Sequence, residues 1–285
     1  MKHAPKYLKY AGSKARILPE VAELLLDTTD QFKVDGKLKR FVEPFFGSGV
    51  VGMNVPAHDK IFNDFNEDIM LTHRAVIQNP ERVIELCERL WKLGYAGYYH
   101  VREDFRALKK TDSIFTRAAL FIYMNRFGFN GMVRYNQSGK FNVPVGKSTG
   151  KNPPAIPVDE ILDFGNHIKL VDLCKGSHDF ETVMKLNADK RTTIYCDPPY
   201  INLNGKGEIK YTEAGFTLET QERLAKAAED ACNRGSRVLV SNHDLEITRE
   251  LYKNATRIVE IEAFRSISSK GGTRGNANEL VAIYE

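Results

Sequence analysis

The fold is decided by the stretch RFVEPFFGSGVVG, residues 40–52, in which a short apolar segment leads directly into glycines with the spacing G-x-G-x-x-G. A glycine turn after a strand lets a nucleoside ligand approach a backbone that carries no Cβ atoms. A nicotinamide cofactor would also need a crossover helix of about ten residues, but Pro56 comes four residues after Gly52. The stretch therefore predicts an α/β fold with a tight turn and a smaller nucleoside ligand.

Asp64 is the acidic residue at the end of the next expected strand, residues 60–63. Its carboxylate can accept hydrogen bonds from both ribose hydroxyl groups of an adenosine. The alternative is structural: a glycine turn with Asp64 as the cap of a helix that begins near Glu67. Both interpretations stay open on the local sequence.

Short segments rich in Val, Ile or Tyr alternate with helical patterns along most of the chain. The expected strands are residues 40–44, 60–63, 192–196, 237–241, 257–262 and 279–284, and the expected helices are residues 15–25, 67–78, 80–93, 98–108, 113–126 and 217–234. This alternation predicts an open sheet with crossover connections. Helix 113–126 is expected to be amphipathic, with Asp112 as its cap.

Residues 67–158 lack a convincing buried strand, which predicts a domain organisation with an insert. We expect a discontinuous domain of residues 1–66 and 159–285, interrupted by a mainly helical domain of residues 67–158. A polar, Pro-rich linker at residues 147–157 leads back to the sheet.

Composition places the chain among ordinary folded proteins. Its 285 residues are 42% hydrophobic and 27% charged, and the net charge of +4 is too small to identify a nucleic-acid partner by itself. No apolar run approaches the ~18 residues of a membrane span, and the first residues lack the apolar core of a signal peptide, so we expect a cytoplasmic protein without membrane contact. Four widely spaced cysteines argue against a zinc ribbon or a disulfide framework. No obligate protein partner is evident, and a monomer is expected.

Basic and aromatic residues gather in one part of the chain. Residues 113–158 contain no Asp or Glu but six Lys or Arg and seven aromatic side chains. Cations that meet phosphates and rings that stack on bases are typical of a nucleic-acid surface. Residues 263–278 form a second acid-free stretch, with three cations. The alternative for both stretches is a solvated surface.

The sharpest chemical signal is Asp197-Pro198-Pro199-Tyr200, directly after the expected strand 192–196. Two prolines end the strand and remove two backbone donors, which leaves the Asp197 carboxylate and the Pro198 carbonyl as stiffly held acceptors. Two acceptors suit an exocyclic amino group, and Tyr200 can stack on the attached ring. The alternative is a simple turn at the end of a strand.

Together these segments resemble the DNA adenine-N6 methyltransferases, and more narrowly the Dam type that methylates GATC. The matching residues are 8–14 (LKYAGSK), 43–49, 62–64, 123–136 (YMNRFGFNGMVRYN), 141–147, 196–200, 241–244 and 265–274, in the family's order. The resemblance implies a mixed, mostly parallel, seven-stranded Rossmann-like methyltransferase sheet that binds S-adenosyl-L-methionine. The helical insert would be the target-recognition domain for double-stranded DNA. Tyr10, Ser13 and Ser48 depart from residues that the family often has at these places.

The resemblance also implies the reaction and the residues of its site. The enzyme would flip the adenine and transfer the methyl group by direct in-line attack of N6, without a covalent intermediate and without a metal. The cofactor residues would be Tyr10, Lys14, Phe45, Gly47, Asp64, Asp179, Phe180 and Asp197. The catalytic residues would be Asp197, Pro198 and Tyr200.

A further set of residues resembles the DNA contacts of the family, namely Lys9, Arg126, Phe129, Asn130, Met132, Arg134, Pro144 and Lys147. Within this set, Lys9 and Arg134 would recognise guanine, a role that suits the fork of an arginine. Phe129 and Met132 would wedge between bases. The others would contact the backbone, flanking bases or a thymine methyl group.

Three other functions are weighed against this one. A magnesium-dependent nuclease would use Asp197, Glu208 and Lys210. A cytosine-C5 methyltransferase would need a thiol nucleophile, for which Cys196 is the candidate. A non-catalytic DNA-binding protein would explain the basic stretch but not the Asp197–Tyr200 segment.

Overall fold

The computed structural model describes residues 6–10, 12–109, 113–147, 153–203, 209–210, 216–261 and 278–285. The chain forms two compact units. The helical unit comprises Met1–Ala15, Phe46–Asn54 and Asn63–His178, and the sheet unit comprises Arg16–Phe45, Val55–Phe62 and Asp179–Glu285. The division into a catalytic domain, residues 1–66 and 159–285, and a target-recognition domain, residues 67–158, is a functional one and stays a prediction.

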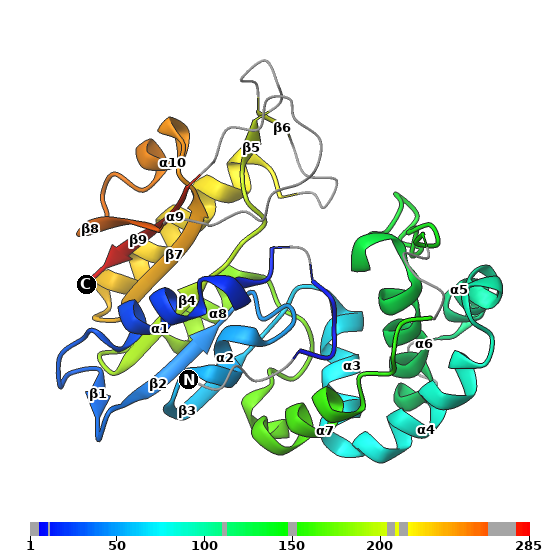
Figure 1. Cartoon of the computed structure of the whole chain (residues 1–285). Helices are drawn as coiled ribbons and strands as arrows, with labels where there is room; N and C mark the ends of the chain where they lie inside the picture. The colour runs from blue at the N-terminus through cyan, green and yellow to red at the C-terminus, as the bar shows by residue number, and fades with distance from the viewer. Residues whose placement is uncertain are drawn as a thin grey trace. The chain divides into compact units, whose positions relative to one another are not determined.

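The sheet unit is built on a mixed, partly parallel sheet (Figure 1). Its strands among the described residues are β1 (Lys33–Val34), β2 (Lys37–Glu43), β3 (Ala57–Phe62), β4 (Thr192–Cys196), β7 (Arg237–His243), β8 (Arg257–Ile261) and β9 (Glu279–Tyr284). β2 is parallel to β3 and β4, and β4 is parallel to β7, whereas β9 is antiparallel to β7 and to β8. All six expected strands form, and the two-residue β1 was not expected. β5 (Asn202–Leu203) and β6 (Ile209–Lys210) form a separate antiparallel pair.

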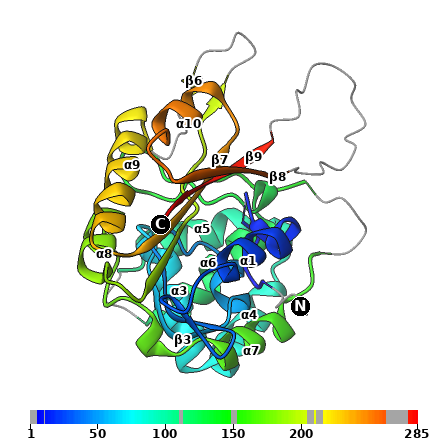
Figure 2. The same ribbon diagram turned by 90° about the vertical axis from the view of Figure 1, so that its left-hand side faces the viewer.

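Helices cover both faces of this sheet. They are α1 (Leu18–Leu26), α8 (Phe180–Asn187), α9 (Leu218–Asn233) and α10 (Glu246–Leu251). α8 and α9 lie on one face and α1 on the other (Figure 2). Met184 of α8 and Leu224 of α9 belong to the same buried cluster as Ile194 of β4. α8 and α10 were not expected from the sequence, because helices of eight and six residues are too short to show a clear periodic pattern.

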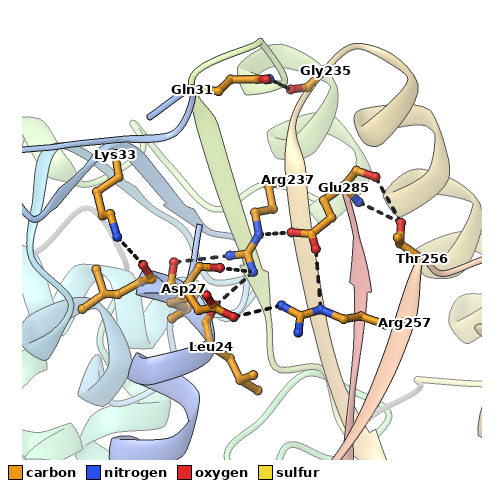
Figure 3. Close-up of polar contacts among 11 residues, drawn as sticks. Leu24, Asp27, Gln31, Lys33, Gly235, Arg237, Thr256, Arg257 and Glu285 are labelled. Carbon is orange, nitrogen blue, oxygen red and sulfur yellow. Dashed lines mark hydrogen bonds and ion pairs between the residues drawn. The ribbon is translucent and has the colours of Figure 1, made fainter. Parts of the chain in front are cut away.

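A fully buried arginine fixes α1 to the sheet (Figure 3). The guanidinium of Arg237, the first residue of β7, donates hydrogen bonds to the carbonyl oxygens of Leu24, Leu25 and Asp27, at 3.0, 3.3 and 3.1 Å. These carbonyls lie at the end of α1, where the helix itself offers no donors. The Nε atom of Arg237 lies 2.6 Å from a carboxylate oxygen of Glu285. One side chain therefore neutralises a carboxylate and caps a helix.

We predict that Arg237→Met lowers the free energy of unfolding by about 3–5 kcal/mol, because it leaves a partly buried carboxylate and three helix-end carbonyls without their donor. Urea denaturation followed by circular dichroism measures the change. Lys253→Met is the matched control, because Lys253 is exposed and its ion pair among the described residues is with Glu250 of its own surface segment, and it should leave the midpoint unchanged. Equal effects of the two substitutions would contradict this account of α1.

The helical unit contains α2 (Val50–Asn54), α3 (Glu67–Gln78), α4 (Pro80–Trp91), α5 (Tyr98–Ala107), α6 (Ile114–Phe127) and α7 (Val158–His167). α6 contacts α3, α4 and α5, which surround it (Figure 1). Short 3-10 turns occur at Lys14–Arg16, Tyr95–Gly97, Phe129–Gly131 and Leu170–Asp172. The brevity of α2 agrees with the argument that Pro56 leaves no room for a long crossover helix.

The amphipathic pattern expected for residues 113–126 was wrong. Ten of the fourteen residues of α6 are buried, including Arg117 and Asn125, because three helices surround it. Ser113 is the observed cap, and its hydroxyl accepts from the backbone N–H of Thr116 at 3.4 Å. The expected cap, Asp112, lies outside the described residues.

Candidate functional site

The glycine turn after β2 has left-handed backbone angles. Gly47 has φ +50° and Gly49 φ +76°, a region that favours glycine. A Cβ atom on Gly47 would lie 3.1 Å from the ring of Tyr10, and one on Gly49 would lie 2.8 Å from the ring of Phe46. The structure therefore brings together Tyr10 and Gly47, two of the residues expected at the cofactor.

Asp64 holds this turn from one side. Its carboxylate is buried and accepts hydrogen bonds from the backbone N–H groups of Gly47 and Asn66, both at 2.8 Å. Burial raises the pKa of Asp64 to about 6, and the two hydrogen bonds oppose the rise. The helix that follows is capped by Asn66, whose side chain accepts from the backbone N–H groups of Asp68 and Ile69, so the cap that the structural alternative assigned to Asp64 is Asn66. Each carboxylate oxygen retains further acceptor capacity for a ligand.

His73 holds the turn from the other side, and the sequence analysis did not single it out. Its Nε2 atom lies 2.8 Å from the carbonyl oxygen of Gly47 and its Nδ1 atom 2.5 Å from the hydroxyl of Tyr7. Because a carbonyl can only accept, Nε2 carries the proton and Nδ1 accepts from Tyr7. The ring is fully buried, stacks on Phe164 with centroids 4.7 Å apart, and its pKa is lowered by burial to about 4.

The low pKa of His73 predicts a loss of stability in mild acid. A histidine whose pKa is lowered in the folded state binds its proton more tightly when unfolded, so its contribution is full above pH 6.5 and is lost as the pH falls towards 4. Asp64, whose pKa is raised, makes the opposite contribution to the pH dependence of the unfolding free energy. A variant of His73 is needed to separate its contribution from that of Asp64. The difference in unfolding free energy between the natural chain and His73→Gln should shrink by about 2 kcal/mol between pH 7 and pH 5. Urea titrations at both pH values measure it, and a constant difference would contradict a buried neutral His73.

Lys9 is joined through Asn125 to Gly131, which lies among the residues expected to contact DNA. The side-chain amide of Asn125 pairs with the backbone N–H and carbonyl of Lys9, both at 2.8 Å, and donates to the carbonyl of Gly131 at 2.9 Å. A Cβ atom on Gly131 would lie 2.4 Å from that of Lys9. Lys9 thus lies beside Asn130, a non-glycine residue with φ +53°. The pKa of Lys9 is lowered by burial and by the nearby charge of Arg126.

Residues 128–145 form a hairpin-like loop, which we call the recognition hairpin. Antiparallel bridges join Gly128 to Val145 and Tyr135 to Phe141. Five of the expected DNA contacts lie on it: Phe129, Asn130, Met132, Arg134 and Pro144. Phe129, Asn130 and Pro144 are exposed, and Lys147 just beyond the hairpin is exposed too.

Two of the expected DNA-contacting arginines make internal hydrogen bonds. The guanidinium of Arg134 donates through Nε and Nη2 to the carbonyl of Asn142, at 3.2 and 2.8 Å. Arg126 donates from Nε to the carbonyl of Tyr7 at 3.0 Å. Lys14, expected at the cofactor, is buried and donates to the carbonyl of Gly12 at 3.2 Å.

In the sheet unit, side chains from α9 and β7 hold the backbone of the segment after β4. The carbonyl of Pro199 accepts from the side chain of Gln221 at 2.8 Å, and the N–H of Ile201 donates to Asn242 at 3.2 Å. The carbonyl of Ile201 accepts from Nδ1 of His243 at 2.8 Å. Gln221 and Asn242 are buried and bond to each other at 3.1 Å. This network fixes the direction in which the chain leaves the sheet.

The ring of Tyr200 is also fixed. Its hydroxyl donates to Glu279 at 2.9 Å, and its ring meets that of His243 edge-on with centroids 4.8 Å apart. Burial, and then the negative charge of Asp197, raises the pKa of Tyr200 well above its usual value. Asp197 and Tyr200 are separated in the chain by two prolines, of which Pro198 is buried.

Three further expected cofactor residues lie in the sheet unit, namely Phe45, Asp179 and Phe180. The rings of Phe45 and Phe180 stack with centroids 5.4 Å apart. Asp179 caps α8 through the N–H of Glu181 at 3.0 Å and forms an ion pair with Arg223 at 3.2 Å. Its carboxylate thus has structural partners that the sequence did not reveal.

Of the competing enzymes, the structure bears on the cytosine-C5 methyltransferase. Cys196 is fully buried, and burial raises the pKa of its thiol far above the usual range, which disfavours a thiolate nucleophile. Of the residues of the nuclease alternative, Glu208 lies outside the described residues. Among the residues that the structure describes, no group of three His, Cys, Asp or Glu side chains is placed to hold a metal ion.

Comparison with known proteins decides the family. The model of the family described as D12 class N6 adenine-specific DNA methyltransferase matches residues 10–267. The chain belongs to this family. It is 35% identical to the DNA adenine methylase of Escherichia coli (strain K12), over 100% of this chain and 97% of that protein, and 34% identical to that of Vibrio cholerae (El Tor Inaba N16961), with the same coverage.

A DNA N-6-adenine-methyltransferase of Escherichia phage P1 is 34% identical over 96% of the chain, which spans 35% of that longer protein. The chain is thus an adenine-specific DNA methyltransferase of the Dam type. Among the described helices, none has the length and apolar character to cross a membrane.

Proposed function

We propose that this methyltransferase uses S-adenosyl-L-methionine to methylate adenine N6 within GATC, on a base flipped out of double-stranded DNA. The proposal is carried by the Asp197–Tyr200 segment. It leaves the edge where the parallel strands β2 and β4 both end, a usual ligand position in α/β sheets. Its two prolines offer no backbone donors, and Gln221 and Asn242 hold it in place. The sheet would then be the Rossmann-like sheet of a methyltransferase.

In the proposed reaction, the Asp197 carboxylate and the Pro198 carbonyl each accept one hydrogen of the N6 amino group. This turns the nitrogen lone pair out of conjugation and aims it at the methyl group, while Tyr200 stacks on the flipped adenine. When bound, S-adenosyl-L-methionine would supply a sulfonium methyl group to N6 by direct displacement and would leave as S-adenosylhomocysteine. Asp197 would stabilise the positive charge that develops on N6, and the surplus N6 proton would pass to solvent. No covalent enzyme intermediate and no metal takes part.

The cofactor residues fit a nucleoside. Gly47 presents a bare backbone that a Cβ atom would fill beside Tyr10, and Asp64 is a buried carboxylate with acceptor capacity for ribose hydroxyls. We assign Lys14 to the same ligand as a donor, and Phe45, Phe180 and Asp179 to its adenosine. Catalytic and cofactor residues thus come from the proposed catalytic domain, residues 1–66 and 159–285.

The DNA contacts are proposed for the recognition hairpin and its surroundings, in the target-recognition domain of residues 67–158 together with Lys9. Arg134 and Lys9 recognise guanine, and Phe129 and Met132 wedge into the stack that the adenine leaves. Asn130, Arg126 and Pro144 contact the backbone or neighbouring bases, and Lys147 contacts a phosphate. A cytoplasmic location and a monomeric state remain predictions.

Asp197→Ala should lose nearly all methyl transfer while binding to duplex DNA survives, because the carboxylate acts on the amino group and not on the duplex. Asp197→Asn, which keeps the shape, is the matched variant and should be almost as inactive. Transfer of label from S-adenosylmethionine to a GATC duplex, with and without a chelator, measures activity. Activity that disappears with the chelator, or strand cleavage that depends on magnesium, would favour the nuclease. If the natural chain bound DNA but transferred no label, the result would favour the alternative of a non-catalytic DNA-binding protein.

Arg134→Ala and Lys147→Ala should separate base recognition from phosphate contact. Arg134→Ala should lower kcat/KM on GATC by a factor that corresponds to about 1–3 kcal/mol and relax discrimination at one base, since a bidentate guanine contact is lost. Lys147→Ala should weaken binding to all sequences alike and reduce the salt slope by about one. Methylation of GATC and its single-base variants at several salt concentrations tests both. An equal loss on all sequences in Arg134→Ala would move recognition to another residue.

A further inference from the structure

The helical unit contains a buried polar cluster that the proposed reaction does not use. The guanidinium of Arg117, on α6, lies 2.7 Å from Oδ1 of Asp68, in the first turn of α3. The other carboxylate oxygen of Asp68 accepts from the hydroxyl of Tyr135 at 2.5 Å. Asp68 and Arg117 are only 5% and 7% exposed. Burial and the adjacent carboxylate raise the pKa of Tyr135 far above its usual value. The hydroxyl of Tyr135 therefore stays protonated and donates a hydrogen bond to Asp68.

On one side, this cluster adjoins the carboxylate expected at the ribose. Asn66 caps α3 by accepting from the N–H of Asp68 at 3.0 Å, and its own N–H donates to Asp64 at 2.8 Å. The hydroxyl of Tyr135 lies 3.4 Å from the Asn66 side-chain oxygen. The first turn of α3 therefore contacts Asp64 through its backbone and Tyr135 through Asp68.

On the other side, the cluster anchors the recognition hairpin. Tyr135 is the neighbour of Arg134 in the chain and forms a bridge with Phe141, whose ring it meets edge-on at 5.7 Å. The backbone N–H of Asn142 donates to the carbonyl of Arg134 at 2.8 Å. A shift of Tyr135 against Asp68 would therefore move the backbone that carries Arg134.

We propose that Tyr135 and Asp68 are positioning residues that couple cofactor binding to DNA recognition. The inference rests on the proposed roles of Asp64 and Arg134. A ligand bound to Asp64 favours one position of the first turn of α3. Through its hydrogen bond to Asp68, the Tyr135 hydroxyl then favours the hairpin position that fits this position of α3. By linkage, DNA held by the hairpin must then tighten cofactor binding by the factor by which the cofactor tightens DNA binding.

The structure provides a matched control in Tyr98. Its hydroxyl donates at 3.0 Å to the carbonyl of Val143, on the returning side of the same hairpin. Tyr98 is fully buried on α5, and its bond to the hairpin does not involve α3. Tyr98→Phe and Tyr135→Phe therefore each remove one hydroxyl that holds the hairpin, but only Tyr135→Phe removes the connection to Asp68. Asp68 keeps its ion pair with Arg117 in both variants, which preserves the fold.

The experiment measures the affinity of the full chain for S-adenosylhomocysteine by calorimetry, with and without a saturating GATC duplex. In the natural chain, the duplex should tighten binding by at least about fivefold, the lower end of usual coupling factors. Tyr135→Phe should reduce this factor to near one and leave the affinity without DNA unchanged. Tyr98→Phe should weaken DNA binding but keep the coupling factor.

Three results would overturn the proposal: no coupling in the natural chain, full coupling in Tyr135→Phe, or an equal loss of coupling in Tyr98→Phe. A loss of affinity in Tyr135→Phe without DNA would also overturn it, since the residue would then belong to the cofactor site itself. Failure of the natural chain to bind S-adenosylhomocysteine or to methylate GATC would instead refute the proposed function. The two failures are therefore distinguishable.

Discussion

The hydrogen bond from the backbone N–H of Gly47 to the buried carboxylate of Asp64 is the constraint on which the candidate cofactor site depends. A buried carboxylate is unfavourable unless donors satisfy it, and both donors here are backbone groups, one in the turn and one at the start of α3. Since the carbonyl oxygen of Gly47 also accepts a hydrogen bond from Nε2 of His73, Gly47 is held through both its N–H and its carbonyl group. The left-handed turn is thus held by two hydrogen bonds, and any residue other than glycine at this place would meet the ring of Tyr10.

The segment after β4 is also held by buried hydrogen-bond partners, but here the partners are side chains and not backbone groups. Its prolines fix the backbone angles but remove N–H donors, so the buried side chains of Gln221 and Asn242 have to supply the contacts that a strand would normally make. The two side chains also bond to each other and to the hydroxyl of Tyr252. Such a network is costly if one member is missing. It therefore favours a single position of the segment after β4, as the direct transfer proposed above would require.

The sequence predicted those parts of the fold that local pattern determines. All six expected strands form, and α3 has the expected bounds, because apolar periodicity and an Asn cap act within a few residues. It failed where tertiary contacts decide: α6 is buried on every side, and α8 is too short to show a period. Among site residues, the glycine turn, Asp64 and the Asp197–Tyr200 segment carry local signals. His73, Gln221, Asp68 and Arg237 do not, since each acts on a residue that lies 20 or more positions away in the chain.

The acid-free stretch of residues 113–158 shows why a count of charges overstates the surface available to DNA. Of its six cations, Arg117 neutralises Asp68, and Arg126 and Arg134 donate to carbonyl groups of Tyr7 and Asn142. In the role proposed for it, Arg134 must exchange the Asn142 carbonyl for the O6 and N7 atoms of guanine. That exchange is favourable only where a base offers two acceptors in the geometry of the fork. In that proposed role, the internal hydrogen bond would compete with the contact to any base that offers a single acceptor, and such a contact would then be less favourable than none.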